Sequence, residues 1–345
     1  MKSIKKLATV SSIVSALFAP LASADPVKLN MPSVYPGSLT QLGTAGVRVA
    51  DTVNLISGGE VKIKFFEPGA LVPALEIFDA VSNGSVDAGW STSGYWGSKN
   101  SALNIFATVP FGPQAGEYLA WMWYGDGDKL KNEIYNRHGI QSITCGIHSP
   151  ETSGWFKKEI NSPADLKGLK MRFYGIGAKV MQKLGVDTQL LAGGDIFPAL
   201  ERGTIDATEF SMPAIDLKLG FYNAAKHNYF PGWHQQSTIQ ELLVNKKKWD
   251  GMTERQQAII ETTCRSNIAT QYAEGEAIQA PALAEMKEKG VITHRWNDEM
   301  LDALRGGWIT VLAEEKAANP EFESVWNNLE QFREQYAVWK NLGYL

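Results

Sequence analysis

One arginine lies inside an apolar segment that reads as a buried strand, Leu169 to Tyr174. Arg172 is followed closely by the glycine turn 175–177. Arginine is rarely buried without an anionic partner, and its planar guanidinium group can bind a carboxylate through two parallel hydrogen bonds. We therefore expect Arg172 to bind an anion. A structural carboxylate of the protein is one candidate, and the nearby glycine turn favours the carboxylate of a ligand.

Three glutamates lie in or beside other apolar segments. Glu209 follows a strand-like segment and is costly to bury without a cation, so it forms a salt bridge, with Arg172 as one candidate, or binds a metal ion or a donor group of a ligand. Glu151 begins ETSGWF, where a capping or surface role is favoured, and Glu241 lies in the apolar run TIQELLVN. Three converging glutamates would provide oxygen ligands for a hard cation, but the sequence does not show that they converge.

Aromatic residues follow several of the same segments. Most large aromatic side chains belong to a core, whereas those at strand ends can wall a pocket for a small ligand. The aromatic residues that we consider are Tyr35, Trp90, Tyr95, Trp96, Tyr174, Phe210 and Trp233.

The elements that must position these residues alternate between strand and helix. Residues 27–34 and 61–66 have strand patterns, residues 38–57 and about 70–83 have helical spacing, and VDAGW, residues 86–90, reads as a third strand. This alternation predicts βαβ units and a mostly parallel sheet.

An internal similarity predicts two domains. Residues 77–90, IFDAVSNGSVDAGW, match residues 196–209, IFPALERGTIDATE, at one constant offset. Upstream, residues 61–70 match residues 169–178 more loosely, with Lys64 opposite Arg172. Because ligands of open α/β sheets bind beyond the carboxyl ends of the strands, we expect one cleft between two similar domains.

The remaining chain is mostly helical. Helix-compatible spacing covers 113–137, about 213–226, 252–289 and 298–341, and a strand-like segment after Trp233 returns toward the first domain. We expect an α/β fold in which residues 25–149 and about 235–275 form one domain. Residues 150–234 and the long C-terminal helices form the other.

The N-terminus and the composition limit the class of protein. Residues 1–24 combine three lysines, a short apolar run and a small-residue cleavage site, as in a secretory signal peptide. The net charge of −4 and the lack of a basic patch exclude nucleic-acid binding from our expectations. In an exported protein Cys145 and Cys264 form a disulfide or remain two buried thiols, and the sequence does not decide between them.

Motifs of common enzymes are missing. The sequence contains no G-x-S-x-G, H-E-x-x-H or P-loop motif, and the GIG turn lacks the third glycine of a dinucleotide fingerprint. The alternatives to a binding protein are an exported hydrolase or lyase that uses Glu209 and Glu151 as acid and base, and a periplasmic sensor subunit.

Three long segments, in order, carry a resemblance to a known family. ETSGWFKKEINSPADLKGLKMRFYGIGAKVMQKLG, GGDIFPALERGTIDATEF and LGFYNAAKHNYFPGWHQQSTIQELLVNKKKWD resemble TRAP-transporter solute-binding proteins of the DctP family. The similarity extends from about residue 26 to the C-terminal helices. It is nearest to the subgroup that binds 2-oxo acids and lactate through a metal ion.

The resemblance implies a fold and a function. The fold would be that of a two-domain periplasmic binding protein, type II-like, with a ligand cleft between the domains. The protein would be periplasmic and would deliver a small organic acid to the small and large membrane subunits of a TRAP permease. The oligomeric state stays open: the long C-terminal helices pack on a second subunit, as in the swapped-helix dimers possible in this subgroup, or on their own domain.

The resemblance also implies roles for residues. Arg172 would hold the ligand carboxylate and Tyr95 would hydrogen-bond the ligand. Glu209 would coordinate calcium or sodium, together with the backbone carbonyl of Phe210, and Glu241 lies in a strand that approaches the same site. Glu151, at a position that is commonly glutamine in the subgroup, would contact the ligand. Tyr35 and Trp233 are added to the predicted ligand site as aromatic wall residues on their residue type alone.

Three positions depart from the family pattern. Glu151 replaces a glutamine, Phe210-Ser211-Met212 replaces tryptophan before Gly-Pro, and HQQS at 234–237 replaces HEPG. The site could therefore bind a different ion or no ion, or a ligand with a cationic group.

Overall fold

The first βαβ unit forms the edge of one domain. The computed structural model describes residues 25–344, and the signal peptide predicted for residues 1–24 lies outside them. Strands β1 (Val27–Pro32) and β2 (Val61–Phe66) pair in parallel, and α1 (Leu42–Ile56) connects them. The predicted order of strand, helix and strand is confirmed, and apolar positions on one face of α1 and alternate positions of β2 are buried.

The rest of this domain surrounds a three-stranded sheet of order β3-β10-β4. A bridge between Ser33 and Trp90 joins that sheet to β1. Its elements are η1 (Ala74–Glu76), α2 (Ile77–Asn83), β3 (Ala88–Ser91), η2 (Ser93–Trp96), η3 (Ser101–Phe106), α3 (Ala115–Tyr124), α4 (Gly127–Arg137), β4 (Ile140–His148), β10 (Thr238–Asn245) and α8 (Lys246–Asp250). Every residue of β10 is buried, so this strand is the centre of the first core.

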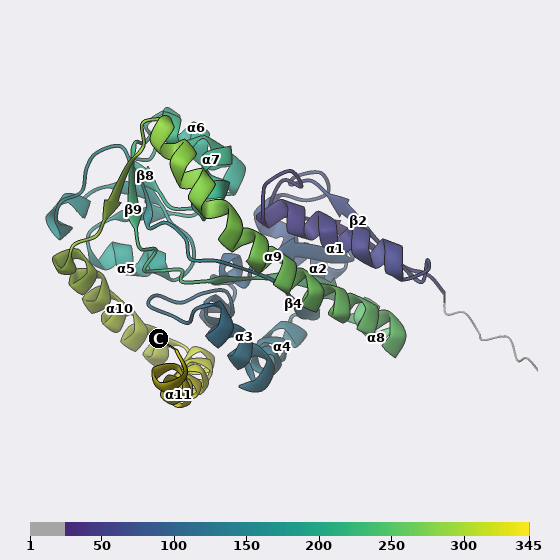
Figure 1. Cartoon of the computed structure of the whole chain (residues 1–345). Helices are drawn as coiled ribbons and strands as arrows, with labels where there is room; N and C mark the ends of the chain where they lie inside the picture. Colours follow the sequence, from purple (N-terminus) through teal and green to yellow (C-terminus); the bar gives the residue numbers. More distant parts are fainter. Residues whose placement is uncertain (1–24, 345) are drawn as a thin grey trace, which may run out of the picture.

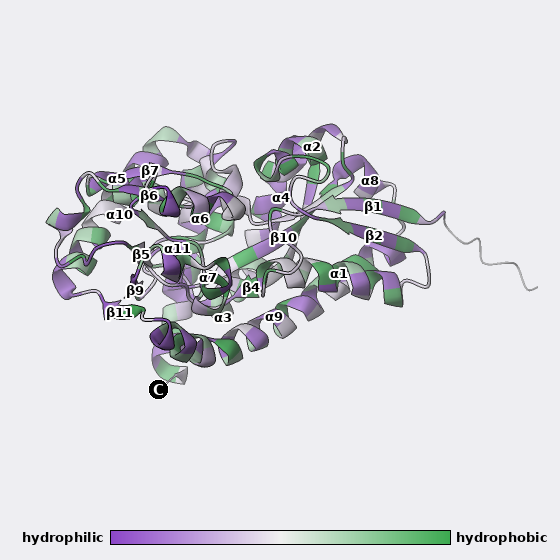
Figure 2. Cartoon of the chain, turned by 90° about the horizontal axis from the view of Figure 1, so that it is seen from above, coloured by the Kyte–Doolittle hydropathy of each residue, from purple (hydrophilic) through white to green (hydrophobic). Residues whose placement is uncertain are grey.

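The second domain contains a six-stranded sheet of order β11-β9-β5-β8-β6-β7. Its elements are β5 (Gly154–Phe156), η4 (Pro163–Leu166), β6 (Lys170–Arg172), α5 (Gly177–Lys183), β7 (Asp187–Gln189), α6 (Gly193–Glu201), β8 (Ala207–Thr208), α7 (Pro213–Leu219), η5 (Phe221–Asn223), β9 (His227–Phe230) and β11 (Ile292–Arg295). Figure 2 shows β1, β2 and α1 on one side of the molecule and β5, β9 and β11 on the other.

The prediction of mostly parallel strands is confirmed, but each domain contains one reversed strand, which makes the sheets mixed. β10 runs antiparallel to β3 and β4, and β5 runs antiparallel to β8 and β9. The two reversed strands, β5 and β10, each directly follow a crossing of the chain between the domains, from β4 to β5 and from β9 to β10. The direction of β5 and of β10 is therefore set by the entry of the chain from the other domain and not by a βαβ connection.

The internal similarity corresponds to a repeated helix, glycine turn and strand. α2 leads to β3 through Gly84 with φ 80°, and α6 leads to β8 through Gly203 with φ 76°. Both glycines adopt the left-handed conformation that residues with a Cβ atom disfavour. The aligned basic residues differ, since Arg172 is buried whereas Lys64 is exposed beside the ring of Phe66.

Helix α9 (Glu254–Glu288) extends along both domains (Figure 1). It packs on α1 and β4 in the first domain and on α7 in the second. A capping box between Thr253 and Gln256 begins the helix. Cys145 of β4 and Cys264 of α9 form a disulfide, so the sequence alternative of two buried free thiols does not apply.

The C-terminal helices are divided between the domains. α10 (Asp298–Ala318) packs on α5 of the second domain, where Lys183 pairs with Glu314 at 2.7 Å. α11 (Pro320–Gly343) instead packs on η3 and α3 of the first domain, so our assignment of both helices to the second domain does not describe α11. Polar contacts from Asn319 to Asn100 and Ser101 anchor the start of α11 there.

Among residues 25–344, no helix combines the length and the apolarity that crossing a membrane requires.

Candidate functional site

A small cavity lies between the two domains. The space available to the centre of a water-sized sphere is about 20 Å³, and all the residues around it are buried. The cavity is lined by Tyr35, Leu42, Thr92 and Tyr95 of the first domain, by Arg172, Tyr174, Phe210 and Ser211 of the second, and by His148, Glu151, Gln235 and Thr238 of the crossing segments. Closure of the domains therefore encloses a space suited to a small ligand.

Arg172, at the end of β6, is held rigidly at this cavity. Its Nη1 donates to the carbonyl oxygen and to Oε1 of Glu209, both at 2.8 Å, and its Nε donates to the carbonyl of Leu191 at 3.2 Å. The ring of Phe210 lies 5.2 Å from the guanidinium carbon. Arg172 therefore pairs with a carboxylate of the protein, Glu209, which was one of the two partners that the sequence allowed. Its guanidinium group also lines the cavity, where the other partner, a ligand carboxylate, would bind.

Glu209 follows β8 and is fully buried. Its Oε1 also accepts a hydrogen bond from the amide of Tyr174. Burial opposes ionisation, but Arg172, His234 and the Tyr174 amide outweigh it and lower the pKa of Glu209. Glu209 is therefore a carboxylate, and its second oxygen, Oε2, has no hydrogen-bond partner within the described residues.

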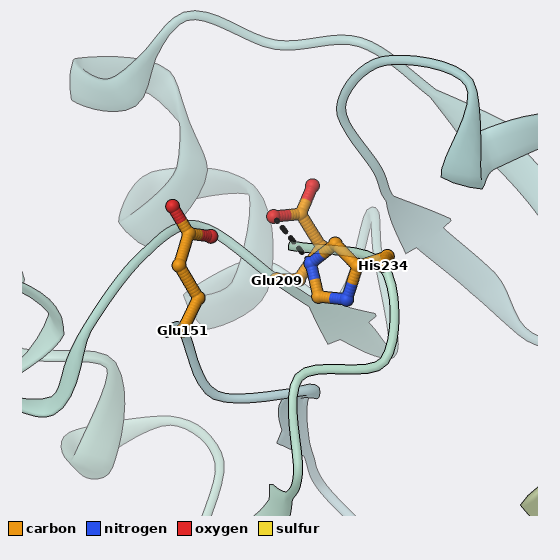
Figure 3. Close-up of side chains that lie close together, drawn as sticks. All are labelled: Glu151, Glu209 and His234. Atoms are coloured by element: carbon orange, nitrogen blue, oxygen red, sulfur yellow. Dashed lines mark ion pairs between the residues drawn. The ribbon is translucent and has the colours of Figure 1, made fainter. Parts of the chain in front are cut away.

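Glu151, Glu209 and His234 form a cluster with the composition of a metal site. One potential ligand atom from each lies within 4.8 Å of the others. Figure 3 shows them arriving from three separate segments, with His234 Nε2 3.6 Å from Glu209 Oε2. Glu151 Oε2, Glu209 Oε2 and both ring nitrogens of His234 are buried without partners in the described structure. Buried carboxylate oxygens are costly unless satisfied, so Glu151 and Glu209 fit a bound cation.

Acidic side chains outnumber cationic ones in and around the cluster. Burial raises the pKa of Glu151 well above its usual value, and the nearby charges of Glu209 and Asp216 raise it further. Burial also raises the pKa of Asp216 to about 8, although the indole of Trp155 donates a hydrogen bond to it. His148 lies 3.3 Å from Glu151, but burial lowers the pKa of His148 to about 4, so it is neutral at pH 7.

The structure brings together most of the residues that the sequence indicated. Arg172, Tyr95, Glu151, Phe210 and Tyr35 line the cavity. Glu209 adjoins Arg172.

Three of the predicted residues, Glu209, Trp233 and Glu241, lie outside the cavity lining. Trp233 is buried nearby, but its ring packs against Phe111 and Phe173, with centroids 5.9 Å and 6.0 Å away.

Glu241 does not join the cluster, and we withdraw it as a metal ligand. Its carboxylate accepts hydrogen bonds from Tyr135 and Ser142, each at 2.7 Å, and also from Trp96 and Ser91. These donors belong to the core of the first domain and satisfy both oxygens. Burial still raises the pKa of Glu241, partly offset by the charge of Lys131.

Sequence reasoning missed two polar residues of the site, His234 and His148, and the neighbouring Asp216 that influences it. His234 directly follows Trp233, which had been selected as an aromatic residue, and His148 lies three residues before Glu151. Asp216 lies in the first turn of α7, where an acidic residue is common at a helix start. None of these positions differs in pattern from an ordinary loop or helix residue.

Comparisons with known proteins agree with this geometry. Residues 33–317 match the family model DctP, bacterial extracellular solute-binding protein, family 7. The chain is 35% identical over 322 residues to a monocarboxylate 2-oxoacid-binding periplasmic protein of a Nostoc species, covering 92% of this chain and 87% of that protein.

Two solved structures are also similar. A TRAP transporter solute-binding protein of Bordetella bronchiseptica, described as a mixed-occupancy dimer with copurified calcium and picolinate, has a TM-score of 0.90 and 34% identity, covering 92% of this chain and 95% of that one. A TRAP periplasmic solute-binding protein of Pseudoalteromonas atlantica, with sodium and pyruvate, has a TM-score of 0.89 and 30% identity, covering 92% and 97%. The resemblance in the sequence is confirmed: this chain belongs to the DctP family, the bacterial extracellular solute-binding proteins of family 7.

Proposed function

We propose that this protein captures a small organic acid in the periplasm and delivers it to the small and large membrane subunits of a TRAP transporter. The ligand class is a 2-oxo or 2-hydroxy monocarboxylate. The observation that carries the proposal is the buried Arg172, which lines a closed cavity between two domains. A guanidinium group in a site without bulk water binds a carboxylate more strongly than it does in water.

The proposal includes a bound cation, calcium or sodium. Glu209 and Glu151 are the side chains that would hold it, and the backbone carbonyl of Phe210 is a further oxygen ligand implied by the family. His234 offers a nitrogen, which these hard cations disfavour, so it would orient the Glu209 carboxylate instead. Such an ion supplies positive charge that attracts the carboxylate and the 2-oxygen of a ligand. The partnerless oxygens of Glu151 and Glu209 support this part of the proposal.

Charge balance favours calcium over sodium. Arg172 and Glu209 neutralise each other as an ion pair. Glu151 has a raised pKa and would ionise only with a cation bound beside it. Its charge and the ligand carboxylate then leave two negative charges in a buried site, where unpaired charges are costly. A divalent ion balances both, whereas a monovalent ion leaves one uncompensated.

A thermal-shift screen of ligand-free protein tests both parts. Pyruvate, lactate and related acids are added with calcium, with sodium or with a chelator. A ligand at a hundred times its dissociation constant stabilises the folded protein by about 2.7 kcal/mol. We expect the largest shift for a 2-oxo or 2-hydroxy acid with calcium, and a loss of that shift with the chelator.

The variant Glu151→Gln separates the ion from the acid. It keeps a side chain of similar size but removes one negative charge, so the preference for calcium over sodium should narrow. An acid that binds equally well with and without the chelator would contradict the metal site and leave the transport proposal intact. No response to any acid would contradict the ligand class.

We also propose that the protein is not an enzyme. The alternative function, a hydrolase or lyase, requires Glu151 and Glu209 to act as acid and base on a bound organic acid. Incubating the acid with the protein and following it by NMR would reveal any turnover. A sensor subunit could have the same ligand site, and identification of the membrane partner distinguishes it.

A second copy of this chain is the remaining proposed partner. Val338, Trp339, Leu342 and Tyr344 at the end of α11 are all more than half exposed, and they form the surface that we assign to a homodimer. Analytical ultracentrifugation of the purified protein distinguishes the dimer from a monomer.

A further inference from the structure

The cleft between the domains contains a second, outer pocket. The space in it for the centre of a water-sized sphere is about 340 Å³, far larger than the inner cavity. Its walls come from both domains, with Ser98 and Asn104 on one side and Phe173, Ile176 and Leu190 on the other. Among residues 25–344, Tyr95 is the one that lines both this outer pocket and the inner cavity.

The side chain of Tyr95 therefore forms the partition between the two spaces. It is only 8% exposed. Its ring meets Tyr174 edge to face at 4.9 Å between centroids and lies 6.2 Å from Tyr35 and 6.1 Å from Trp96. An aromatic ring fixed by three neighbours is a wall that a ligand cannot easily displace.

Tyr174, which faces Tyr95, is fixed more firmly. Thr92 donates its hydroxyl hydrogen to the carbonyl of Ile239 at 2.8 Å, so the hydroxyl of Tyr174 must donate to Thr92 Oγ1, 3.0 Å away. The backbone amide of Tyr174 also donates to Glu209. Tyr95 is held by packing with other aromatic rings and by its hydroxyl's interaction with Tyr35. It has no bond to the backbone among the described contacts, so it is the part of the wall that a substitution can remove.

The outer pocket has the chemistry to accept an apolar tail. Phe173, Ile176, Ala178 and Leu190 contribute apolar surface, and Leu190 is 38% exposed. The one basic side chain there, Lys179, is already paired with Glu315. A hydrocarbon chain that entered this pocket would bury apolar surface, which is favourable, whereas a second carboxylate would find no free basic partner among the pocket residues.

We propose that Tyr95 sets the upper size limit of the ligand by separating the inner cavity from the apolar outer pocket. This inference rests on the proposed function, because it takes the ligand to be an organic acid bound at Arg172. Acids with the length of pyruvate fit behind the Tyr95 ring. Acids with longer alkyl tails are excluded by that ring and not by a lack of space in the cleft.

The test compares two acids on three variants. Dissociation constants for pyruvate and for 2-oxohexanoate are measured by calorimetry for the wild type, Tyr95→Leu, Tyr95→Ala and the control Tyr95→Phe. The readout is the ratio of the two constants, so a general change in affinity does not affect it. We expect the wild type and Tyr95→Phe to prefer pyruvate by more than tenfold, and Tyr95→Leu and Tyr95→Ala to lower that preference by roughly tenfold or more, equivalent to about 1.4 kcal/mol.

Tyr95→Ala removes a buried aromatic ring entirely, which costs about 3–5 kcal/mol of folding stability. Tyr95→Leu is included because leucine keeps part of the buried apolar volume. Thermal melting identifies the variants that remain folded. An unchanged ratio in a folded Tyr95→Leu protein that binds pyruvate would overturn the inference alone. A wild type that binds 2-oxohexanoate as tightly as pyruvate would also overturn it. A wild type that binds neither acid would overturn the proposed function, and this inference with it.

Discussion

At the scale of single residues, Arg172 combines a structural and a proposed binding role. Its salt bridge with Glu209 explains how an arginine that is only 1% exposed can be tolerated. Because Nε and Nη1 are already hydrogen-bonded, the guanidinium group cannot rotate freely. A carboxylate entering the cavity therefore meets a donor whose orientation is already fixed, which reduces the entropy cost of binding.

Arg172→Lys tests the binding role with the charge retained. Lysine cannot reproduce the planar fork, so the ligand should lose a hydrogen bond to a charged group, worth about 1.5–3 kcal/mol, or roughly 10- to 100-fold in affinity. Calorimetry measures this loss.

Arg172→Ala serves as the comparison for stability. It leaves Glu209 buried without its partner and should lower the free energy of unfolding by about 3–5 kcal/mol. Unchanged ligand affinity in Arg172→Lys would show that the arginine is structural only.

The sequence identified charged residues that need partners, but it could not identify the partners. Arg172 and Glu209 stood out because they interrupt apolar strands, and they do pair with each other. Glu241 gave the same signal, yet its partners are Tyr135 and Ser142, whose proximity depends on the packing of α4 and β4 against β10. His234 opens the HQQS segment, but nothing in the sequence placed it beside Glu209, because its position follows from the loop after β9.

At the scale of elements, local periodicity was a reliable guide, and the parallel direction predicted for the strands fails only for β5 and β10 among the described strands. The helical and strand patterns of residues 27–91 predicted β1, α1, β2, α2 and β3 because each element buries one face of its own sequence. The directions of β5 and β10 depend on which domain the chain has just left, and no pattern within either strand contains that information.

The disulfide is the element-scale feature most open to experiment. It joins β4 to α9 across 119 residues of sequence. Cross-linking a loop of about this length restricts the unfolded chain, by an amount equivalent to about 4–5 kcal/mol in the entropy model, although measured values are typically about 2–4 kcal/mol. We expect Cys145→Ala/Cys264→Ala to lose about this much stability in denaturant titrations.

The ligand affinity of the same variant provides the control. Neither cysteine lines the cavity, so well below the melting temperature the affinity should stay close to that of the wild type. An unchanged free energy of unfolding would contradict a stabilising role for the bond. A large loss of affinity in a folded variant would instead link the disulfide to closure of the cleft.

At the scale of the whole molecule, the structure is a closed form in which the two domains touch directly around the cavity. Thr92 and Tyr95 of the first domain contact Tyr174 of the second. Closure of this kind removes water from the site and strengthens its electrostatic interactions. The affinity measured in solution therefore includes the free energy of closing, and a change that opposes closure should weaken binding without touching the ligand.

Gly94 is the position where this coupling can be isolated. A Cβ atom there would overlap the hydroxyl and ring of Tyr174, which belongs to the other domain, and its three nearest contacts are all atoms of that one side chain. Gly94→Ala should leave each domain folded and favour the open form. A shift of about 1.4 kcal/mol toward opening weakens the apparent affinity tenfold, and small-angle scattering with saturating ligand should show how far the variant still closes.

Gly116→Ala is the matched control, because a Cβ atom at that helical glycine meets nothing within 4 Å. It should bind and scatter like the wild type. If Gly94→Ala keeps wild-type affinity and closes fully, the contact between Gly94 and Tyr174 does not limit closure. If it instead loses thermal stability without ligand, Gly94 contributes to folding of the first domain, and the affinity change cannot be assigned to the movement of the two domains.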